Sequence, residues 1–212
     1  MNERSFLVVG LLFRLHTHWE IENFGVGNGG QDVSDIKIEL ITEADYREVL
    51  EFELNNREFL RQTVPGRDDD QFYQPQNLRS FYESQLVAIE QGESFFYLIR
   101  NRIGELAGRC HLYDLMRGAR QKAEIGCHLS HQHSRQGIAS KALHLLVREA
   151  FDTHGLHRIE ASTITSNIPA QMAVLRLGFQ YYGMSEAYIL LNKEWRDCVH
   201  FAIVNREWKA KR

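Results

Sequence analysis

The 212-residue chain has few cysteines and no long hydrophobic run. Its three cysteines, Cys110, Cys127 and Cys198, are scattered and form no Cys-x-x-Cys pair, which excludes a disulfide framework and predicts a reducing compartment. The one apolar run near the start, residues 6–13, is too short to span a bilayer. No small-residue cleavage site follows it cleanly, so we interpret it as a strand or an extension rather than a signal peptide. We therefore expect a cytoplasmic protein with no membrane partner.

The chain also lacks a large excess of charge of either sign. Its net charge is −3 at pH 7 and it contains no long basic run, which argues against direct binding of nucleic acid. Hydrophobic residues make up 43% and charged residues 25%, the balance of a globular domain. Residues 23–35 carry four glycines and resemble a linker. We expect residues 1–35 to form an N-terminal extension and linker, and residues 36–212 to form one domain.

Regular hydrophobic periodicity begins at Ile36 and predicts alternating elements. The expected strands are residues 36–41, 94–100, 106–115, 124–129, 157–163, 181–191 and 196–204, and the expected helices are residues 42–55, 78–91, 137–153 and 170–177. Thr42 and Asp45 form a capping-box pattern at the first helix, and residues 61–77 are expected to form a polar loop. This order predicts an α/β (mixed α+β) domain, with a central mixed, mostly antiparallel sheet of about seven strands flanked by four helices.

The most informative segment is residues 124–143, where a strand ends near Leu129 and a helix opens at Gly137. Backbone N–H groups in the first turn of a helix have no internal partners, and the helix dipole places positive charge there, so such a terminus holds anions. Gly137 would let the backbone approach a phosphate, and Arg135 could add a charge-assisted contact. The same residues also fit an ordinary strand–loop–helix connection.

The stretch Ser134-Arg135-Gln136-Gly137-Ile138-Ala139 resembles the signature Gln/Arg-x-x-Gly-x-Gly/Ala of the GCN5-related N-acetyltransferases (GNAT), with Ser in the first place. Leu177-Gly178-Phe179 matches a further family motif. The resemblance implies the GNAT fold, acetyl-CoA as co-substrate, and a strand that splays from its neighbour to pair with pantetheine. The cofactor-binding residues that it implies are His128, Leu129, Ser134, Arg135, Gln136, Gly137, Ile138, Ala139, Ser140 and Asn167.

Other segments are similar to the bacterial ribosomal-protein-alanine N-acetyltransferases, namely residues 56–60, 117–118, 157–159 and 192–197. The similarity implies acetyl transfer in a ternary complex to the N-terminal α-amine of a protein, with a ribosomal protein as the acceptor that the subfamily suggests. Where the subfamily tends to carry a Pro-Trp pair, this chain has Gln62-Thr63, which leaves a small amine (antibiotic, polyamine or amino acid) open as the acceptor. Ser134, Ala170 and the lack of a Tyr in the short helix keep a third reading open, a CoA-binding partner protein without turnover. The oligomeric state stays open between a monomer and a dimer.

Catalysis would need a neutral amine and therefore a base. Glu124 is the first candidate, because it begins the strand beside the expected thioester site. Alternation places it on one face with Gly126 and His128. A partly solvated Glu124 paired with Arg or Lys is the alternative. The secondary candidates are Glu186, Tyr188 and Tyr182, of which Tyr182 could protonate the CoA thiolate or could serve only in packing.

Three further features invite a functional interpretation that we do not favour. The histidines 111, 128, 131 and 133 lack the spacing of metal ligands, so we expect no metal site. Cys127 and His128 are neighbours on a strand and point to opposite faces, which favours an inert thiol. Residues 68–70, three consecutive aspartates, could attract a positively charged amine or form a solvated loop.

Overall fold

A computed structural model describes residues 36–209, which form a seven-stranded sheet in the order β1-β2-β3-β4-β5-β7-β6. Only β4 and β5 run parallel, and every other pair of neighbours is antiparallel. The prediction of a mixed, mostly antiparallel sheet is therefore confirmed, whereas the expected extension, residues 1–35, lies outside the described residues. The strands are β1 (Lys37–Leu40), β2 (Phe95–Arg100), β3 (Leu106–Met116), β4 (Lys122–Leu129), β5 (Arg158–Ile164), β6 (Gln180–Leu191) and β7 (Glu194–Val204).

Five α-helices accompany the sheet within the described residues, one more than expected. They are α1 (Tyr46–Asn55), α2 (Arg57–Thr63), α3 (Pro75–Glu90), α4 (Ile138–Arg148) and α5 (Ile168–Arg176). The expected loop over residues 61–77 is wrong at both ends, because α2 reaches Thr63 and α3 begins at Pro75. Helix α2 is short, polar and buries only Leu60, so its sequence shows almost no periodicity. No helix of residues 36–209 is both long and apolar enough to cross a membrane.

The capping pattern at the start of the first helix is confirmed. The amide and the hydroxyl of Thr42 each donate a hydrogen bond of 2.8 Å to Asp45 Oδ2. A short 3-10 turn, Glu43–Asp45, then leads into α1. These bonds satisfy groups that have no partner within the helix and so define where the chain turns from β1 into α1.

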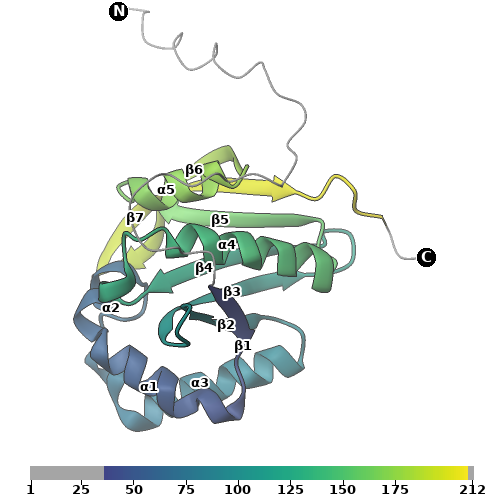
Figure 1. The fold of residues 1–212 in the computed structure, drawn as a ribbon. Coiled ribbons are helices and arrows are strands. Elements are labelled where there is room, and N and C mark those ends of the chain that lie inside the picture. Colours follow the sequence, from purple (N-terminus) through teal and green to yellow (C-terminus); the bar gives the residue numbers. More distant parts are fainter. Residues whose placement is uncertain (1–35, 210–212) are drawn as a thin grey trace, which may run out of the picture. The chain divides into compact units, whose positions relative to one another are not determined.

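The sheet separates two apolar clusters, with α4 and α5 on one face and α1 and α3 on the other (Figure 1). Residues such as Ile125, Leu146 and Ile159 belong to the larger cluster, under α4. Val49 and Leu98 belong to the smaller cluster, under α1 and α3. Because side chains alternate along a strand, the residues between the apolar positions of β4 and β5 point to the face that carries α1 and α3.

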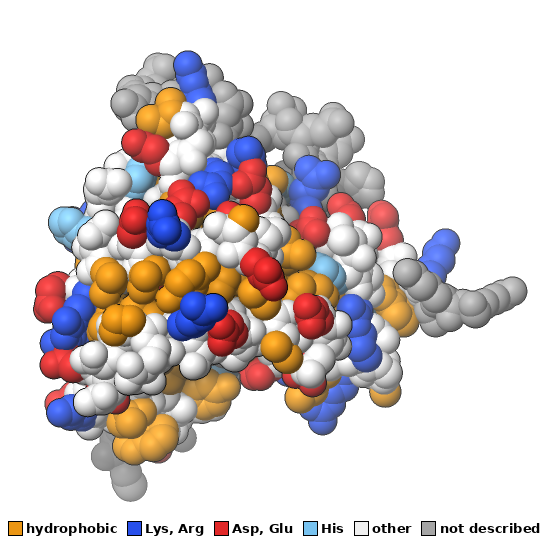
Figure 2. Space-filling view, turned by 90° about the horizontal axis from the view of Figure 1, so that it is seen from below, with side chains coloured by type: hydrophobic (Ala, Val, Ile, Leu, Met, Phe, Trp, Pro, Cys, Tyr) orange, Lys and Arg blue, Asp and Glu red, His pale blue; other side chains and the backbone are white. Residues whose placement is uncertain are grey.

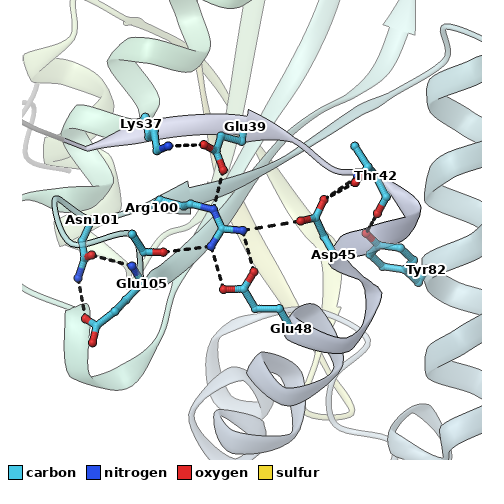
Figure 3. Close-up of polar contacts among 10 residues, drawn as sticks. Lys37, Glu39, Thr42, Asp45, Glu48, Tyr82, Arg100, Asn101 and Glu105 are labelled. Carbon is cyan, nitrogen blue, oxygen red and sulfur yellow. Dashed lines mark hydrogen bonds and ion pairs between the residues drawn. The ribbon is translucent and has the colours of Figure 1, made fainter.

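Arg100 at the end of β2 joins the sheet edge to α1 (Figure 3). Its guanidinium donates to Glu39 Oε2 on β1 at 2.5 Å and, through two nitrogens, to both carboxylate oxygens of Glu48 on α1 at 2.8 and 2.7 Å. The hydrogen bond with Glu48, more than any other contact, raises the pKa of Arg100. This bidentate contact fixes the direction in which α1 leaves the sheet.

The surface seen from below mixes charges of both signs around a band of apolar side chains (Figure 2).

A buried group of charges holds the helical layer against β3. Glu53 on α1, 1% exposed, accepts hydrogen bonds from Arg109 Nη1 on β3 and from Arg67 Nε, each at 3.0 Å. Arg109, 3% exposed, also donates to Gln85 Oε1 on α3. Burial lowers the pKa of Arg109, and the charge of Glu53 opposes that shift. One carboxylate thus balances two buried guanidinium groups.

We expect Glu53→Ala to lower the free energy of unfolding by about 3–5 kcal/mol, because it leaves buried arginines without a counter-charge. The matched control is Glu83→Ala on α3, whose carboxylate pairs with Arg79 at the surface and should change stability by less than about 1 kcal/mol. Urea unfolding followed by circular dichroism measures both. Equal losses in the two variants would show that the buried group does not hold the layers together.

Candidate active site

The two parallel strands at the centre of the sheet separate after a short contact. β4 and β5 pair only from Lys122 to Glu124, opposite Arg158 to Glu160. Beyond this point β4 stays paired with β3 as far as Leu129, and β5 stays paired with β7 as far as Ile164. The backbone edge of residues 125–129 therefore has no partner on β5, which confirms the expected splay and places Glu124 at its apex.

The helix that follows β4 begins with a glycine in the left-handed region. Gly137 has φ +78° and ψ −2°. No atom lies within 4 Å of where a Cβ would stand, so the backbone conformation, rather than a close contact, requires glycine here. Lys141 N donates to Gly137 O at 3.3 Å, and this first bond leaves the preceding amides of residues 138–140 without helical partners. These amides can receive a phosphate group.

Side chains in the loop between β4 and α4 bond mainly to the loop itself. Ser134 Oγ donates to His131 O, and Gln136 Nε2 donates to Gln132 O, each at 2.7 Å. Arg135 is exposed and has φ +62°. Of the predicted cofactor residues in this loop, Ser134 and Gln136 thus stabilise the conformation of the loop. The guanidinium of Arg135 has no ion pair among the described residues and lies close in the chain to the amides of residues 138–140.

The remaining predicted cofactor residues differ in what they can offer. Asn167 Oδ1 accepts a hydrogen bond from Ala170 N at 3.2 Å and caps α5, so its Nδ2 is the group left to donate. The side chain of Leu129 is buried in the larger cluster, and that of His128 packs against Phe52 with ring centroids 6.1 Å apart. At these two positions only the backbone can therefore pair with a ligand lying in the splay.

Glu124 lies at the centre of a hydrogen-bonded chain on the face that carries α1 and α3. Tyr113 Oη and Ser162 Oγ both donate to Glu124 Oε2, at 3.0 and 3.3 Å. Ser162 Oγ also lies 2.9 Å from His200 Nδ1, and His200 Nε2 lies 2.9 Å from Ser185 Oγ. Within the described residues Glu124 has no ion pair, which corrects the alternative in which Arg or Lys neutralises it.

The two tyrosines predicted for catalysis gather on the same face. The rings of Tyr188 and Tyr182 lie 4.8 and 5.8 Å from the His200 ring. Burial raises the pKa of both phenols; among the neighbouring charges, Glu124 raises the pKa of Tyr188, and Glu160 and Glu124 raise that of Tyr182. Both therefore keep their proton at neutral pH.

Glu186, the third secondary candidate, is placed differently. It is exposed and lies next to Ala187, whose φ of +46° marks an irregularity in β6. Asp197 Oδ1 accepts a hydrogen bond from Ala187 N at 2.8 Å and so holds this bulge. No contact among the described residues joins Glu186 to Glu124.

Three residues of this chain, Tyr113, Ser162 and His200, were not selected from the sequence. Ser162 follows buried Ala161 on β5 and alternates with Arg158 and Glu160, and His200 stands between Val199 and buried Phe201 on β7. The available signal was a polar residue that follows the alternation of its strand, which does not distinguish a site residue from an ordinary polar one. Their meeting with Glu124 depends on the order of β4, β5 and β7 in the sheet, which alternation alone does not give.

The histidines, the cysteine and the aspartates have local roles. His111 packs over Gly126, where an added Cβ would lie 2.4 Å from the imidazole, and burial lowers the pKa of His111 to about 3. Burial raises the pKa of Cys127 to about 12, as fits an inert thiol. Asp70 accepts a hydrogen bond of 2.5 Å from Arg57, which lowers its pKa. Over residues 36–209 no three His, Cys, Asp or Glu side chains gather as a metal site.

The pattern of the acetyltransferase (GNAT) domain matches residues 35–180. The chain belongs to the GNAT acetyltransferase family. It is accordingly an acetyl-CoA-dependent N-acetyltransferase, and the open edge of β4 together with the free amides of α4 fits that co-substrate.

Two curated relatives cover most of the chain. The "Probable N-acetyltransferase YjcK" of Bacillus subtilis is 31% identical over 162 residues, which are 76% of this chain and 89% of the relative. The "[Ribosomal protein uS5]-alanine N-acetyltransferase" of Escherichia coli is 26% identical over 180 residues, which are 82% of this chain and 90% of the relative.

Solved structures share the fold at lower identity. Mycobacterium smegmatis RimJ, in complex with CoA-disulfide, superposes with a TM-score of 0.75 at 22% identity and covers 83% of this chain and 85% of its own. The spermidine N-acetyltransferase of Vibrio cholerae, in complex with CoA and spermine, has a TM-score of 0.67 at 17% identity and covers 82% of this chain and 98% of its own.

We expect Gly137→Ala to weaken CoA binding by about tenfold, because alanine in the left-handed region costs about 1 kcal/mol or more and turns the following amides away. The matched control is Gly92→Ala, after α3, where φ is +69° and the space around a Cβ is equally open. Isothermal titration with CoA gives the affinity, and thermal unfolding shows that the strain is similar. A loss of affinity shared by both variants would contradict a role for the α4 terminus.

Proposed function

We propose that this GNAT enzyme acetylates the N-terminal α-amine of a protein, with a ribosomal protein as the first candidate. The observation that carries the proposal is Glu124 at the apex of the splay, held through one oxygen and free at the other. The similarity to the uS5-alanine N-acetyltransferase, which spans 82% of this chain, supports a protein acceptor.

We assign the binding of acetyl-CoA to two sets of groups. The amides of residues 138–140, with Arg135 beside them, would receive the pyrophosphate, because they are unpaired donors at the positive end of a helix. The open backbone edge of residues 125–129 and the Asn167 amide group would hold the pantetheine arm. When bound, acetyl-CoA supplies the activated acetyl group.

Glu124 is the proposed general base. Its Oε2 already accepts two hydrogen bonds. Its Oε1 accepts none from the described residues and is not fully buried. Oε1 can therefore take the proton of an incoming ammonium, directly or through a water molecule, so that the neutral amine attacks the thioester carbonyl. An α-amine has a pKa of about 8 and a lysine side chain a pKa of about 10.4, so the α-amine is the easier of the two for this base to deprotonate.

A phenol is suited to protonate the departing thiolate. Tyr188 and Tyr182 both keep their proton at neutral pH, and both lie beside His200 on the face of Glu124. Their side chains are 45% and 50% exposed, so an acceptor can reach them. We rank Tyr188 first, because its ring lies nearer to the hydrogen-bonded chain than that of Tyr182.

A small amine remains the second candidate acceptor. Gln62 and Thr63 at the end of α2 are exposed and offer no aromatic wall for a peptide. The fold neighbour in complex with spermine acts on a polyamine, as its name states. Purified enzyme offered a peptide that begins with Ala, the same peptide with a blocked N-terminus, and spermidine separates the two. Transfer to the free peptide alone supports the proposal, and transfer to spermidine alone refutes it.

Mass spectrometry tests the same proposal in the cell. In a strain that lacks the gene, we expect the N-terminal acetyl group of at least one protein to disappear and to return when the gene is restored. Restoration with Glu124→Gln should fail. An N-terminal acetylome that does not change would count against a protein acceptor.

We expect Glu124→Gln to lower kcat/KM about 100-fold near pH 7, within the usual range for general base catalysis. The loss should shrink towards pH 9, because more of the α-amine is already neutral there. Glu83→Gln, an exposed carboxamide substitution on α3, is the matched control and should leave the pH–rate profile unchanged. Equal activity of Glu124→Gln and wild type across this range would remove Glu124 from the role.

A further inference from the structure

We infer that His200 is a positioning residue for Glu124, acting through Ser162. The inference rests on the proposed function, since it takes Glu124 as the base. His200 is only 7% exposed, and its two hydrogen-bond partners among the described residues are Ser162 and Ser185. It reaches Glu124 through one hydroxyl group, with 2.9 Å between His200 Nδ1 and Ser162 Oγ and 3.3 Å between Ser162 Oγ and Glu124 Oε2.

The strand order makes this contact a fixed one. Ser162 and His200 are directly opposite each other in the antiparallel pair of β5 and β7. Glu124 lies on the other side of β5, where it forms the last parallel pair with Glu160 before β4 turns away. The three side chains therefore stand on adjacent strands of one sheet, so their relation depends on rigid backbone rather than on a loop.

The hydrogen bond from Ser162 to Glu124 sets the directions that we infer for the other bonds. A carboxylate only accepts, so the single hydroxyl hydrogen of Ser162 is directed to Glu124. Ser162 Oγ must then accept from His200, which requires a hydrogen on Nδ1. His200 Nε2 can in turn accept from Ser185 Oγ, 2.9 Å away. We therefore infer that Nδ1 of His200 carries a hydrogen.

This arrangement orients the carboxylate. With Ser162 and Tyr113 both donating to Oε2, the plane of the carboxylate is held and Oε1 is left for the amine. Without the N–H of His200, the Ser162 hydroxyl is free to rotate and to donate elsewhere. The Tyr188 ring, edge-on to His200 at 4.8 Å, and the Tyr182 ring at 5.8 Å cover the imidazole on the side of β6.

Other ionisable groups around Glu124 must be considered in any pH measurement. Tyr113 faces it from β3, with Asp114 next to Tyr113 in the chain. Lys122 stands on its own strand, Arg158 and Glu160 stand on β5, and Cys198 stands on β7. Tyr182 and Tyr188 belong to β6. Glu160 is already neutralised by Lys122 and Arg158, to both of which it is bonded. The test variants leave all of these groups in place.

Two substitutions separate the hydrogen bond from simple packing. His200→Phe keeps an aromatic ring against Tyr188 but removes the Nδ1 donor. His200→Asn loses the ring but can place an amide N–H near the position of Nδ1. We expect kcat/KM to fall about tenfold in His200→Phe, the effect of one hydrogen bond to a charged network, and to stay within about threefold of wild type in His200→Asn.

The form of the loss distinguishes positioning from a structural defect. In His200→Phe the change should appear in kcat rather than in the KM for acetyl-CoA, and the acid limb of the pH–rate profile should move to higher pH. Ser162→Ala should have the same effect, and the double variant should be no worse than either single variant. Fully additive losses, or a loss in His200→Asn as large as in His200→Phe, would overturn the inference.

His154→Phe is the matched control for the removal of a histidine. His154 Nε2 lies 2.7 Å from Tyr97 Oη, in contact with the larger cluster and away from Glu124. We expect it to change stability without moving the pH–rate profile. If His200→Phe does not fold, Ser162→Ala alone still decides, because it removes the same link with the loss of a single oxygen atom.

A measurement that needs no acceptor separates this inference from the proposed function. Two-bond ¹H–¹⁵N spectra of ¹⁵N-histidine-labelled protein report the tautomer of each ring, and His200 is assigned by comparison with His200→Asn. We expect the Nδ1–H tautomer in wild type and a shift towards Nε2–H in Ser162→Ala. If His200 in the wild type carries its hydrogen on Nε2, the inference is overturned even when the enzyme is active. If His200 carries its hydrogen on Nδ1 but the enzyme transfers no acetyl group to any acceptor, the proposed function is refuted and the inference is not.

Discussion

The structure depends on one constraint, the end of pairing between β4 and β5 after only three residue pairs. Two parallel strands that diverge leave unpaired N–H and C=O groups, which is costly unless a ligand or water satisfies them. Here each strand is held on its outer side, β4 by β3 and β5 by β7, so the gap stays open without collapsing. The open backbone edge of residues 125–129 and the position of Glu124 at its start both follow from this single divergence.

The two faces of the sheet differ in polarity. The face under α4 is apolar and fills with the larger cluster, which supports the helix whose first amides have no helical partners. The other face carries polar groups wherever the strands pass Glu124. Two polar networks lie on it. One surrounds Glu53 beneath α1, and the other runs from Tyr113 through Glu124, Ser162 and His200 to Ser185. Hydrogen bonds of this kind are stronger in the protein interior than in water, so each network helps to fix the side chains that it joins.

Two side chains link the elbow between α1 and α2 to the loop between β4 and α4. Asn56, at the elbow between α1 and α2, accepts a hydrogen bond from His131 N at 3.1 Å, and the Phe59 ring packs edge-on against the His131 ring at 5.2 Å. The segment that resembles ribosomal-protein acetyltransferases in the sequence is therefore also the segment that braces the loop before α4. A substitution at Asn56 or Phe59 would therefore disturb the loop that leads into α4.

The sequence by itself determined most of the elements and the glycine that opens α4, because these depend on local signals. Alternation along β4 and the glycine at 137 are properties of neighbouring residues, as is the Thr42–Asp45 cap, and each was found where expected. The tertiary structure alone decided that α2 is a helix, since only burial of Leu60 stabilises it. It also decided that Ser162 and His200 stand beside Glu124, because strands far apart in the chain meet through sheet order, and no local pattern encodes that order.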